Sequence, residues 1–140
     1  MESRIHITAE NHSKGYNCAQ AILCTYCDLF RMDEETAFRV SEGFGLGMGA
    51  MQSTSGALTG VLMLAGLKNS NGLVSPGSTK ASTYKLAKDL AEEFREMNTT
   101  TVCKELKGIE DGIVKRTCPG CIEDAAKLVE KYLLTDIEGK

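Results

Sequence analysis

The sequence predicts an all-α fold: a compact, single-domain bundle of about five to six helices with a glycine-rich central segment. Apolar residues recur every three or four positions over most of the chain, which is the period of a buried helix face. No stretch alternates as a strand does. The 140 residues, 42% hydrophobic and 25% charged, suit one globular domain. We expect this domain to span 1–140, with a less ordered N-terminus at 1–13 and a C-terminal tail at 135–140.

The first helix is expected from about Tyr16 to Phe30, where an apolar stripe consists of Ala19, Ile22, Leu23, Tyr26, Leu29 and Phe30. Asp33 is suited to cap a second helix, because its side-chain oxygens can accept from free N–H groups and two acidic residues follow it. This helix should end in the run 43–49, since each glycine weakens a helix by about 1 kcal/mol. The glycines of that run allow a sharp turn or a close approach to another element.

The middle of the chain predicts two further helices separated by a loop. The third helix is expected from about Ser53 or Thr54 to Leu67, and the stretch 69–77 is rich in turn residues. Ser78 can cap a long fourth helix. The inner stripe of that helix consists of Tyr84, Ala87, Leu90, Ala91, Phe94 and Met97.

The C-terminal part predicts a short helical piece around Val102 to Leu106, then a mobile connection through Gly108 and Gly112. The last helix opens at Cys118-Pro119, with proline at the first helical position, where its missing N–H does no harm. Its apolar stripe consists of Ile122, Ala125, Ala126, Val129 and Leu133.

Charge and hydropathy exclude several classes of function. The net charge of −3 and the absence of a basic cluster give no reason to expect nucleic acid or an anionic membrane as a partner. The longest apolar run, 56–67, is too short to span a membrane, which takes about 20 residues. Residues 1–14 do not resemble a signal peptide. We therefore expect a cytoplasmic protein that uses neither membrane nor nucleic acid.

Cysteine is abundant for an intracellular chain of this length, and six thiols stand at positions 18, 24, 27, 103, 118 and 121. Closely spaced thiols in a reducing compartment are more often metal ligands or redox groups than structural disulfides. Cys18 should face the interior, whereas Cys24 and Cys27 should be partly exposed on another surface. Cys103 alone is interpreted as a buried core residue.

The segment from Cys118 to Cys121 is the most specific motif. A cysteine in the first turn of a helix is stabilised as a thiolate by unpaired N–H groups and the helix dipole. A thiolate suits both thiol–disulfide exchange and metal binding. No βαβ pattern surrounds the motif, so it is not thioredoxin-like.

Other cofactor motifs fail. No cysteine pair is followed by histidine, which excludes covalent c-type haem. His6 and His12 are interpreted as solvated side chains rather than ligands. The run from Gly45 to Ala50 matches a dinucleotide fingerprint in form, but the pattern before it is helical where the fingerprint needs a strand.

Taken together, five stretches resemble a family of proposed redox-active proteins known by its cysteine pattern, C-GCAxxG-C-C. These stretches are 15–21, 43–49, 55–60, 103–106 and 118–119. The resemblance implies a small all-helical redox domain that binds an iron–sulfur cluster or uses its thiols directly. By position, Cys18, Cys103 and Cys118 correspond to three of the family's cysteines.

The sequence departs from the family pattern at Ser55, where the family has its second cysteine. A serine hydroxyl is a poor ligand for iron or zinc, so either the site is degenerate or Cys121 supplies a fourth sulfur. Small residues on the helix after it allow close approach of neighbouring helices, for a cofactor or for plain packing. The candidate cofactor-binding residues are therefore Ser55, Gly56, Ala57 and Gly60.

Three hypotheses remain open. In the first, an iron–sulfur cluster or another thiophilic metal is held by Cys18, Cys103, Cys118 and Cys121. In the second, Cys118 is the reactive thiol of a thiol–disulfide exchange protein, with Cys121 or Cys18 as the resolving thiol. In the third, the chain is a helical binding or assembly module with a degenerate redox site, expected to form a homodimer. A redox partner is expected in the first two, and its identity is open.

Overall fold

The computed structural model describes residues 2–135. Its α-helices are α1 (Ile5–Ser13), α2 (Cys18–Tyr26), α3 (Glu34–Ser41), α4 (Gly56–Asn69), α5 (Lys80–Asn98), α6 (Cys103–Leu106) and α7 (Cys118–Leu128). Shorter helical segments are η1 (Cys27–Phe30), η2 (Glu42–Phe44), η3 (Gly72–Val74) and the π-helical continuation of α7, η4 (Val129–Leu133). The described residues contain no strand, which confirms the all-α prediction. With seven α-helices, the bundle slightly exceeds the expected five to six.

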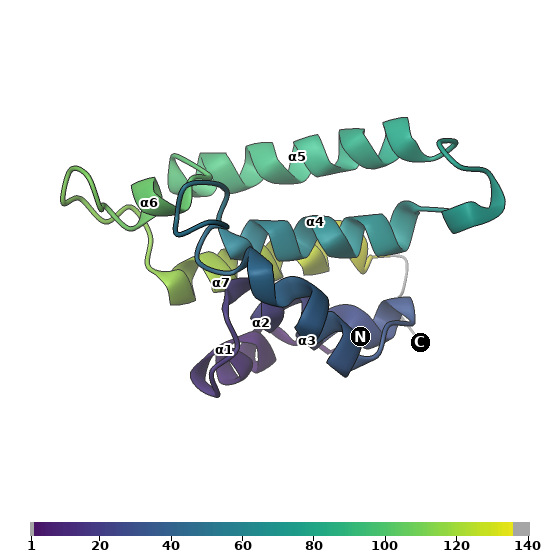
Figure 1. Cartoon of the computed structure of the whole chain (residues 1–140), viewed down its shortest axis with the longest axis horizontal. Coiled ribbons are helices and arrows are strands. Elements are labelled where there is room, and N and C mark those ends of the chain that lie inside the picture. Colours follow the sequence, from purple (N-terminus) through teal and green to yellow (C-terminus); the bar gives the residue numbers. More distant parts are fainter. Residues whose placement is uncertain (1, 136–140) are drawn as a thin grey trace.

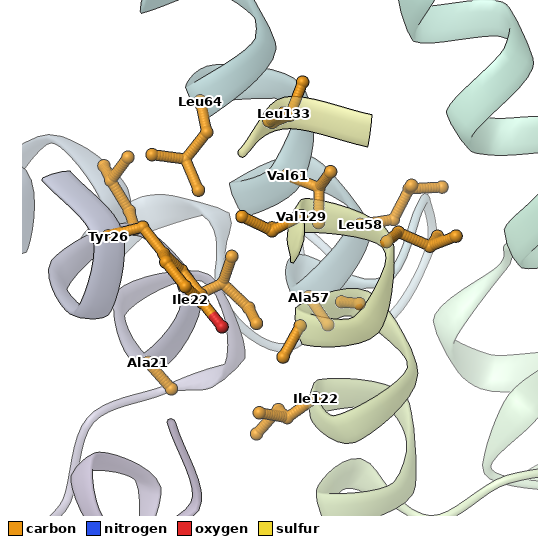
Figure 2. Close-up of a cluster of buried hydrophobic side chains, with 14 of the residues drawn as sticks. Ala21, Ile22, Tyr26, Ala57, Leu58, Val61, Leu64, Ile122, Val129 and Leu133 are labelled. Carbon is orange, nitrogen blue, oxygen red and sulfur yellow. The ribbon is translucent and has the colours of Figure 1, made fainter. Parts of the chain in front are cut away.

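The core lies where α4 contacts α2, α5 and α7 (Figure 1). Figure 2 shows the apolar side chains of α2, α4 and α7–η4 pointing toward one another. Ile22, Val61 and Val129 are completely or almost completely buried there. Tyr26 is also buried, and its hydroxyl donates to Glu130 Oε2 at 2.6 Å. The predicted stripes of the first and last helices therefore meet across the central helix.

Glycine allows α4 to cross α2 at short range. A Cβ atom at Gly60 would lie 3.0 Å from Cβ of Ile22, and one at Gly56 would lie 2.8 Å from the carbonyl oxygen of Phe44. A larger residue at either position would push the two helices apart. The small residues of α4 are therefore packing residues, and Gly56 is also close to Cys18.

Residues 5–13 form α1, which corrects the expectation of a less ordered N-terminus. The sequence of α1 shows no apolar stripe that would predict a helix. Polar groups hold the helix in place instead, and its buried residues are Thr8 and Asn11. Asn11 Nδ2 donates to Thr25 Oγ1 at 3.0 Å, in a buried position. Arg4, just before the helix, donates to the carbonyl oxygen of Thr25 at 2.8 Å and pairs with Asp28 at 2.6 Å.

Helix boundaries follow the predicted caps closely. The first long helix ends at Tyr26 and continues as the 3-10 turn η1. Asp33 caps α3 as expected, accepting from the N–H of Thr36 at 2.9 Å. The long helix α5 begins at Lys80 with Thr79 as its N-cap and no side-chain cap bond, so the expectation that Ser78 caps it is wrong. The expected tail lies outside the described residues from 136 onward.

The glycine run continues into a left-handed turn. Residues 46–51 all have positive φ, between 53° and 72°. Such backbone costs a non-glycine residue about 1–2 kcal/mol, and four of these six residues are not glycine. The segment after the turn is anchored to α6, because Ser53 accepts from the N–H of Cys103 at 2.8 Å. In Figure 1, this loop and α6 lie together at one end of the molecule, beside the start of α4.

None of the helices within residues 2–135 combines the length and the apolar character needed to span a membrane.

Two glycines of the same helix provide a test of the crossing. We expect Gly60→Ala to lower the free energy of unfolding by about 1 kcal/mol, because its methyl group would overpack against α2. Gly66→Ala is the matched control, since a Cβ there meets nothing within 4 Å. It should raise the free energy of unfolding by about 0.5–1 kcal/mol through helix propensity. Urea unfolding followed by circular dichroism measures both, and equal effects of the two variants would contradict the proposed crossing.

Candidate thiol site

Four of the six thiols line one cavity of about 220 Å³. The cavity is lined by His12, Asn17, Cys18, Leu46, Gly47, Ser55, Gly56, Cys103, Leu106, Lys107, Arg116, Cys118 and Cys121. Residues about 100 positions apart in the chain thus meet at one site. All four cysteines proposed as metal ligands are among them, together with two of the four proposed cofactor-binding residues.

The cavity lies where several helices begin. Cys18 is the first residue of α2, Gly56 the first of α4 and Cys118 the first of α7. Free N–H groups and the positive end of the helix dipole are found at such positions. The cavity is therefore built from parts of the chain that favour negative charge.

Side-chain caps fix the starts of α2 and α7, which carry Cys18 and Cys118. The Asn17 side chain accepts from the N–H of Gln20 at 2.9 Å, and Gln20 Oε1 accepts from the N–H of Asn17 at 2.9 Å, which completes a capping box. The Thr117 side chain accepts from the N–H of Gly120 at 3.2 Å. Pro119 is therefore the second helical residue, one position later than expected.

Cys118 is the thiol that most favours ionisation. A hydrogen bond from the Cys18 thiol lowers the pKa of Cys118 most strongly, and the Lys107 side chain and the charge of His12 lower it further. Burial acts in the opposite direction but is outweighed. The same hydrogen bond raises the pKa of Cys18, followed in effect by burial. One thiolate, on Cys118, and one protonated thiol, on Cys18, therefore share the cavity.

The other two cavity thiols stay protonated. Burial is the main cause that raises the pKa of Cys121 to about 12, and the neighbouring charge of Cys118 adds to it. Burial also raises the pKa of Cys103. A single negative charge in the cavity thus disfavours a second one.

Sequence analysis missed the cationic residues of the cavity. Lys107 lies four residues after Cys103, so the two share a helix face, and this spacing could have indicated it. Arg116 precedes the CPGC motif by two residues. His12 carried no signal, because the helix that positions it was not predicted; the structure places it, half-buried, at the cavity.

Arg116 is held in place by the motif it precedes. Its guanidinium donates from Nε to Asp124 Oδ2 at 3.0 Å and from Nη2 to Asp124 Oδ1 at 3.2 Å. A Cβ at Gly120 would lie 2.5 Å from Arg116 Nε. The glycine of CPGC therefore makes room for the guanidinium group against the first turn of α7.

The left-handed turn forms one wall of the cavity. Leu46 and Gly47 line it, and a Cβ at Gly47 would overlap Cβ of Cys103. Positive φ and this close approach both require glycine at Gly47. The expectation that the glycine run serves a sharp turn and a close approach is confirmed at this position.

Some candidate residues lie elsewhere. Ala57 and Gly60 do not line the cavity and pack in the core instead. The expectation of partly exposed Cys24 and Cys27 is wrong, since they are 7% and 2% exposed. Burial raises the pKa values of both thiols and keeps them protonated.

The cavity thiols suit a metal in kind but not in arrangement. Thiolates are the preferred ligands of iron–sulfur clusters and zinc. However, no three His, Cys, Asp or Glu side chains within residues 2–135 are grouped so that they could hold one metal ion. As arranged, the site does not fit single-ion coordination.

Comparison with known families agrees with the site. A family model described as "Putative redox-active protein (C_GCAxxG_C_C)" matches residues 16–132, well over half of the chain. The chain belongs to this family. No curated protein and no solved structure matches it. The C_GCAxxG_C_C match covers every thiol of the cavity, and it supports a redox role for the protein.

The reactivity of the site has a defined dependence on pH. Because the thiolate is the reactive form, alkylation of Cys118 should stay fast down to a pH well below the usual thiol pKa of about 8.5 and be lost only below its own lowered pKa. Lys107→Gln should raise that apparent pKa by about 1 to 2, since a nearby opposite charge is removed. Iodoacetamide labelling from pH 4 to 10, read by peptide mass, measures this.

Lys104→Gln is the matched control for this measurement. Lys104 lies on the same short helix and pairs with Glu110 at 2.7 Å, away from the cavity. The alkylation profile of this variant should coincide with that of the unchanged protein. If every cysteine titrates near 8.5, or if both lysine variants behave alike, the proposed electrostatics are wrong.

Proposed function

We propose that this protein carries out thiol–disulfide exchange, with Cys118 as the attacking thiolate and Cys18 as the resolving thiol. The observation that supports this most directly is that Cys18 and Cys118 line the same cavity, where their interaction lowers the pKa of Cys118 and raises that of Cys18. The charge of Cys118 raises the pKa of Cys121 in addition to burial, whereas Cys18 is the main cause of the lowered pKa of Cys118, so we assign Cys18 as its partner.

The exchange proceeds in two steps. The Cys118 thiolate attacks one sulfur of a substrate disulfide, forms a mixed disulfide and releases the other sulfur as a thiolate. The Cys18 thiol then gives up its proton to that released thiolate and attacks the Cys118 sulfur. A Cys18–Cys118 disulfide forms and the second substrate thiolate leaves, taking up a proton from solvent. The protein is oxidised by two electrons, and the substrate disulfide is reduced to two thiols.

Lys107 and the start of α7 assist the first step. The ammonium group and the helix N–H groups stabilise the thiolate before attack. Once the mixed disulfide forms, the Cys118 sulfur no longer carries a negative charge. That charge therefore no longer opposes ionisation of Cys18. The second thiol therefore becomes more acidic when it is needed.

Trapping distinguishes the two roles. After treatment with 2-hydroxyethyl disulfide, we expect peptide mapping to find a Cys18–Cys118 disulfide in the unchanged protein. Cys18→Ser should stop at the mixed disulfide, with one hydroxyethylthiol group on Cys118. Cys24→Ser is the matched control, because it removes a buried thiol of the same helix outside the cavity and should leave the oxidation product unchanged.

Two results would reject this assignment. One is a stable disulfide between Cys118 and Cys121 with Cys18 left reduced. The other is a Cys118 that remains reduced under conditions that oxidise a free cysteine.

An iron–sulfur cluster is the second candidate, and it is favoured by four thiols around one cavity. Cys18, Cys103, Cys118 and Cys121 would hold such a group, which would supply electron transfer. Cluster binding predicts stoichiometric iron and sulfide after anaerobic purification, with loss of both in Cys103→Ser. Metal-free protein with intact Cys18–Cys118 oxidation would reject the cluster and leave thiol exchange in place.

An assembly module is the third candidate. It is favoured by Ser55 in place of a family cysteine and by apolar side chains exposed between α4 and α5, where Leu73 and Val74 are 92% and 88% exposed. Such side chains could cover one another in a homodimer. This role would be the one left if Cys118 proves unreactive. The free thiols suit a reducing compartment such as the cytoplasm.

A further inference from the structure

Ser55 presents an unused hydroxyl to the thiol cavity. The residue is 4% exposed and lines the cavity. It is the N-cap of α4, yet its side chain makes no capping bond, and among residues 2–135 its hydroxyl has no hydrogen-bond partner. Ser55 Oγ is not fully buried, because the fully buried side-chain oxygens without a partner in the described residues are Glu93 Oε2 and Asn98 Oδ1. The Ser55 oxygen thus keeps contact with space that a small molecule can reach.

Because the Ser55 hydroxyl faces the cavity and makes no hydrogen bond within residues 2–135, a ligand in the cavity can use it. Both backbone groups of Ser55 already have partners. Its N–H donates to the carbonyl oxygen of Thr101 at 2.8 Å, and its carbonyl oxygen accepts from the N–H of Thr59 at 3.1 Å. Only the side chain is left to bind something. Hydroxyl is also a stronger hydrogen-bond donor than the thiol of the cysteine that the family pattern has here.

The size of the cavity restricts the ligand. A volume of about 220 Å³ lies below the roughly 300–1,000 Å³ typical of sites for drug-sized ligands. A bulky disulfide must place one substituent on each side of the attacked bond. A small hydroperoxide offers its terminal oxygen without that requirement.

The donors match the needs of a hydroperoxide. When a thiolate cleaves an O–O bond, the leaving group is an alkoxide or hydroxide, a far stronger base than a thiolate. Such a leaving group depends on nearby donors and a proton source. The Ser55 hydroxyl and the Lys107 ammonium both belong to the cavity that holds the Cys118 sulfur.

We propose that the cavity reduces small hydroperoxides, with the Ser55 hydroxyl and Lys107 binding the peroxide oxygens while the Cys118 sulfur attacks. This inference rests on the proposed thiol pair and assigns it a substrate class. Ser55 is then a functional residue of the site rather than a sign that the site has degenerated.

The reaction balances in two steps. The Cys118 thiolate attacks the terminal oxygen of ROOH, an S–O bond forms and the O–O bond breaks, which leaves a sulfenic acid and RO⁻. The RO⁻ takes a proton from the Lys107 ammonium, which regains one from solvent. The Cys18 thiol then attacks the Cys118 sulfur, and its proton leaves with the hydroxyl as water. The peroxide is reduced to alcohol and water, and two external thiols restore the pair by disulfide exchange.

The test compares two oxidants on fully reduced protein. Rate constants for formation of the Cys18–Cys118 disulfide are measured under single-turnover conditions with hydrogen peroxide and with 2-hydroxyethyl disulfide. We expect Ser55→Ala to lower the ratio of the peroxide to the disulfide rate constant by at least about 10-fold, since loss of one donor to a developing oxyanion costs about 10²–10³. Ser53→Ala is the matched control, because Ser53 is an exposed serine of the same loop that does not line the cavity.

A second readout follows the intermediate itself. In Cys18→Ser, peroxide should leave a sulfenic acid on Cys118 that dimedone traps, and adding Ser55→Ala should slow that trapping by a similar factor. The inference is overturned if Ser55→Ala and Ser53→Ala give the same ratio, or if peroxide oxidises Cys118 no faster than free cysteine while the disulfide still reacts. If neither oxidant joins Cys18 to Cys118, the proposed thiol exchange fails as well.

Discussion

The short-range crossing of α2 and α4 is the constraint on which the site depends. Gly56 has its α-carbon so close to α2 that an added Cβ would meet the backbone nitrogen of Ala19 at 3.2 Å and Cβ of Cys18 at 3.3 Å. The same contact that brings the core side chains together thus places the start of α2 beside the start of α4. Because α7 packs against both helices, its first residue reaches the same point. The thiol cavity is a consequence of how the bundle closes.

Because helix starts meet at the cavity, it favours a negative charge with few cationic side chains. Helix starts supply N–H groups, and Lys107 supplies a cation that lowers the pKa of Cys118. Arg116 is already neutralised by a buried carboxylate, since Asp124 is 6% exposed and bonded through both oxygens. The cavity therefore favours one thiolate and opposes two, which is the state that a dithiol needs before it attacks.

Helix periodicity was enough to predict the architecture, because most helices bury an apolar stripe or begin at a side chain suited to capping. Asp33 and the stripe of α7 are examples. It failed for α1, which is held by polar contacts from Arg4 and Asn11. It also failed for the burial of Cys24 and Cys27, because both belong to the core cluster and α3 and η1 pack against α2. A single helix pattern cannot show what later packs on its second face.

The site was predictable only where family spacing or helix starts pointed to it. That is why the four cavity cysteines and Ser55 could be named, whereas His12 and Lys107 could not. The left-handed turn was also hidden, since the glycines of the run 43–49 indicate a turn but not six consecutive residues with positive φ. Strain of this kind persists only where surrounding contacts fix it. Here the close fit of Gly47 against Cys103 and the hydrogen bond from Cys103 to Ser53 do so.

Helix α2 shows why position, rather than the presence of a thiol, decides the chemistry. Cys18 lies at its positive end, within reach of a partner thiol from α7. Cys24 lies toward the opposite end and Cys27 directly after it, where burial is the main cause that raises both pKa values and the charge of Glu34 adds to it. Burial alone would make all three inert, and it does so for two of them. Only Cys18 lies beside the start of another helix, α7, where Cys118 has a lowered pKa. Redox chemistry is therefore assigned to this end of α2.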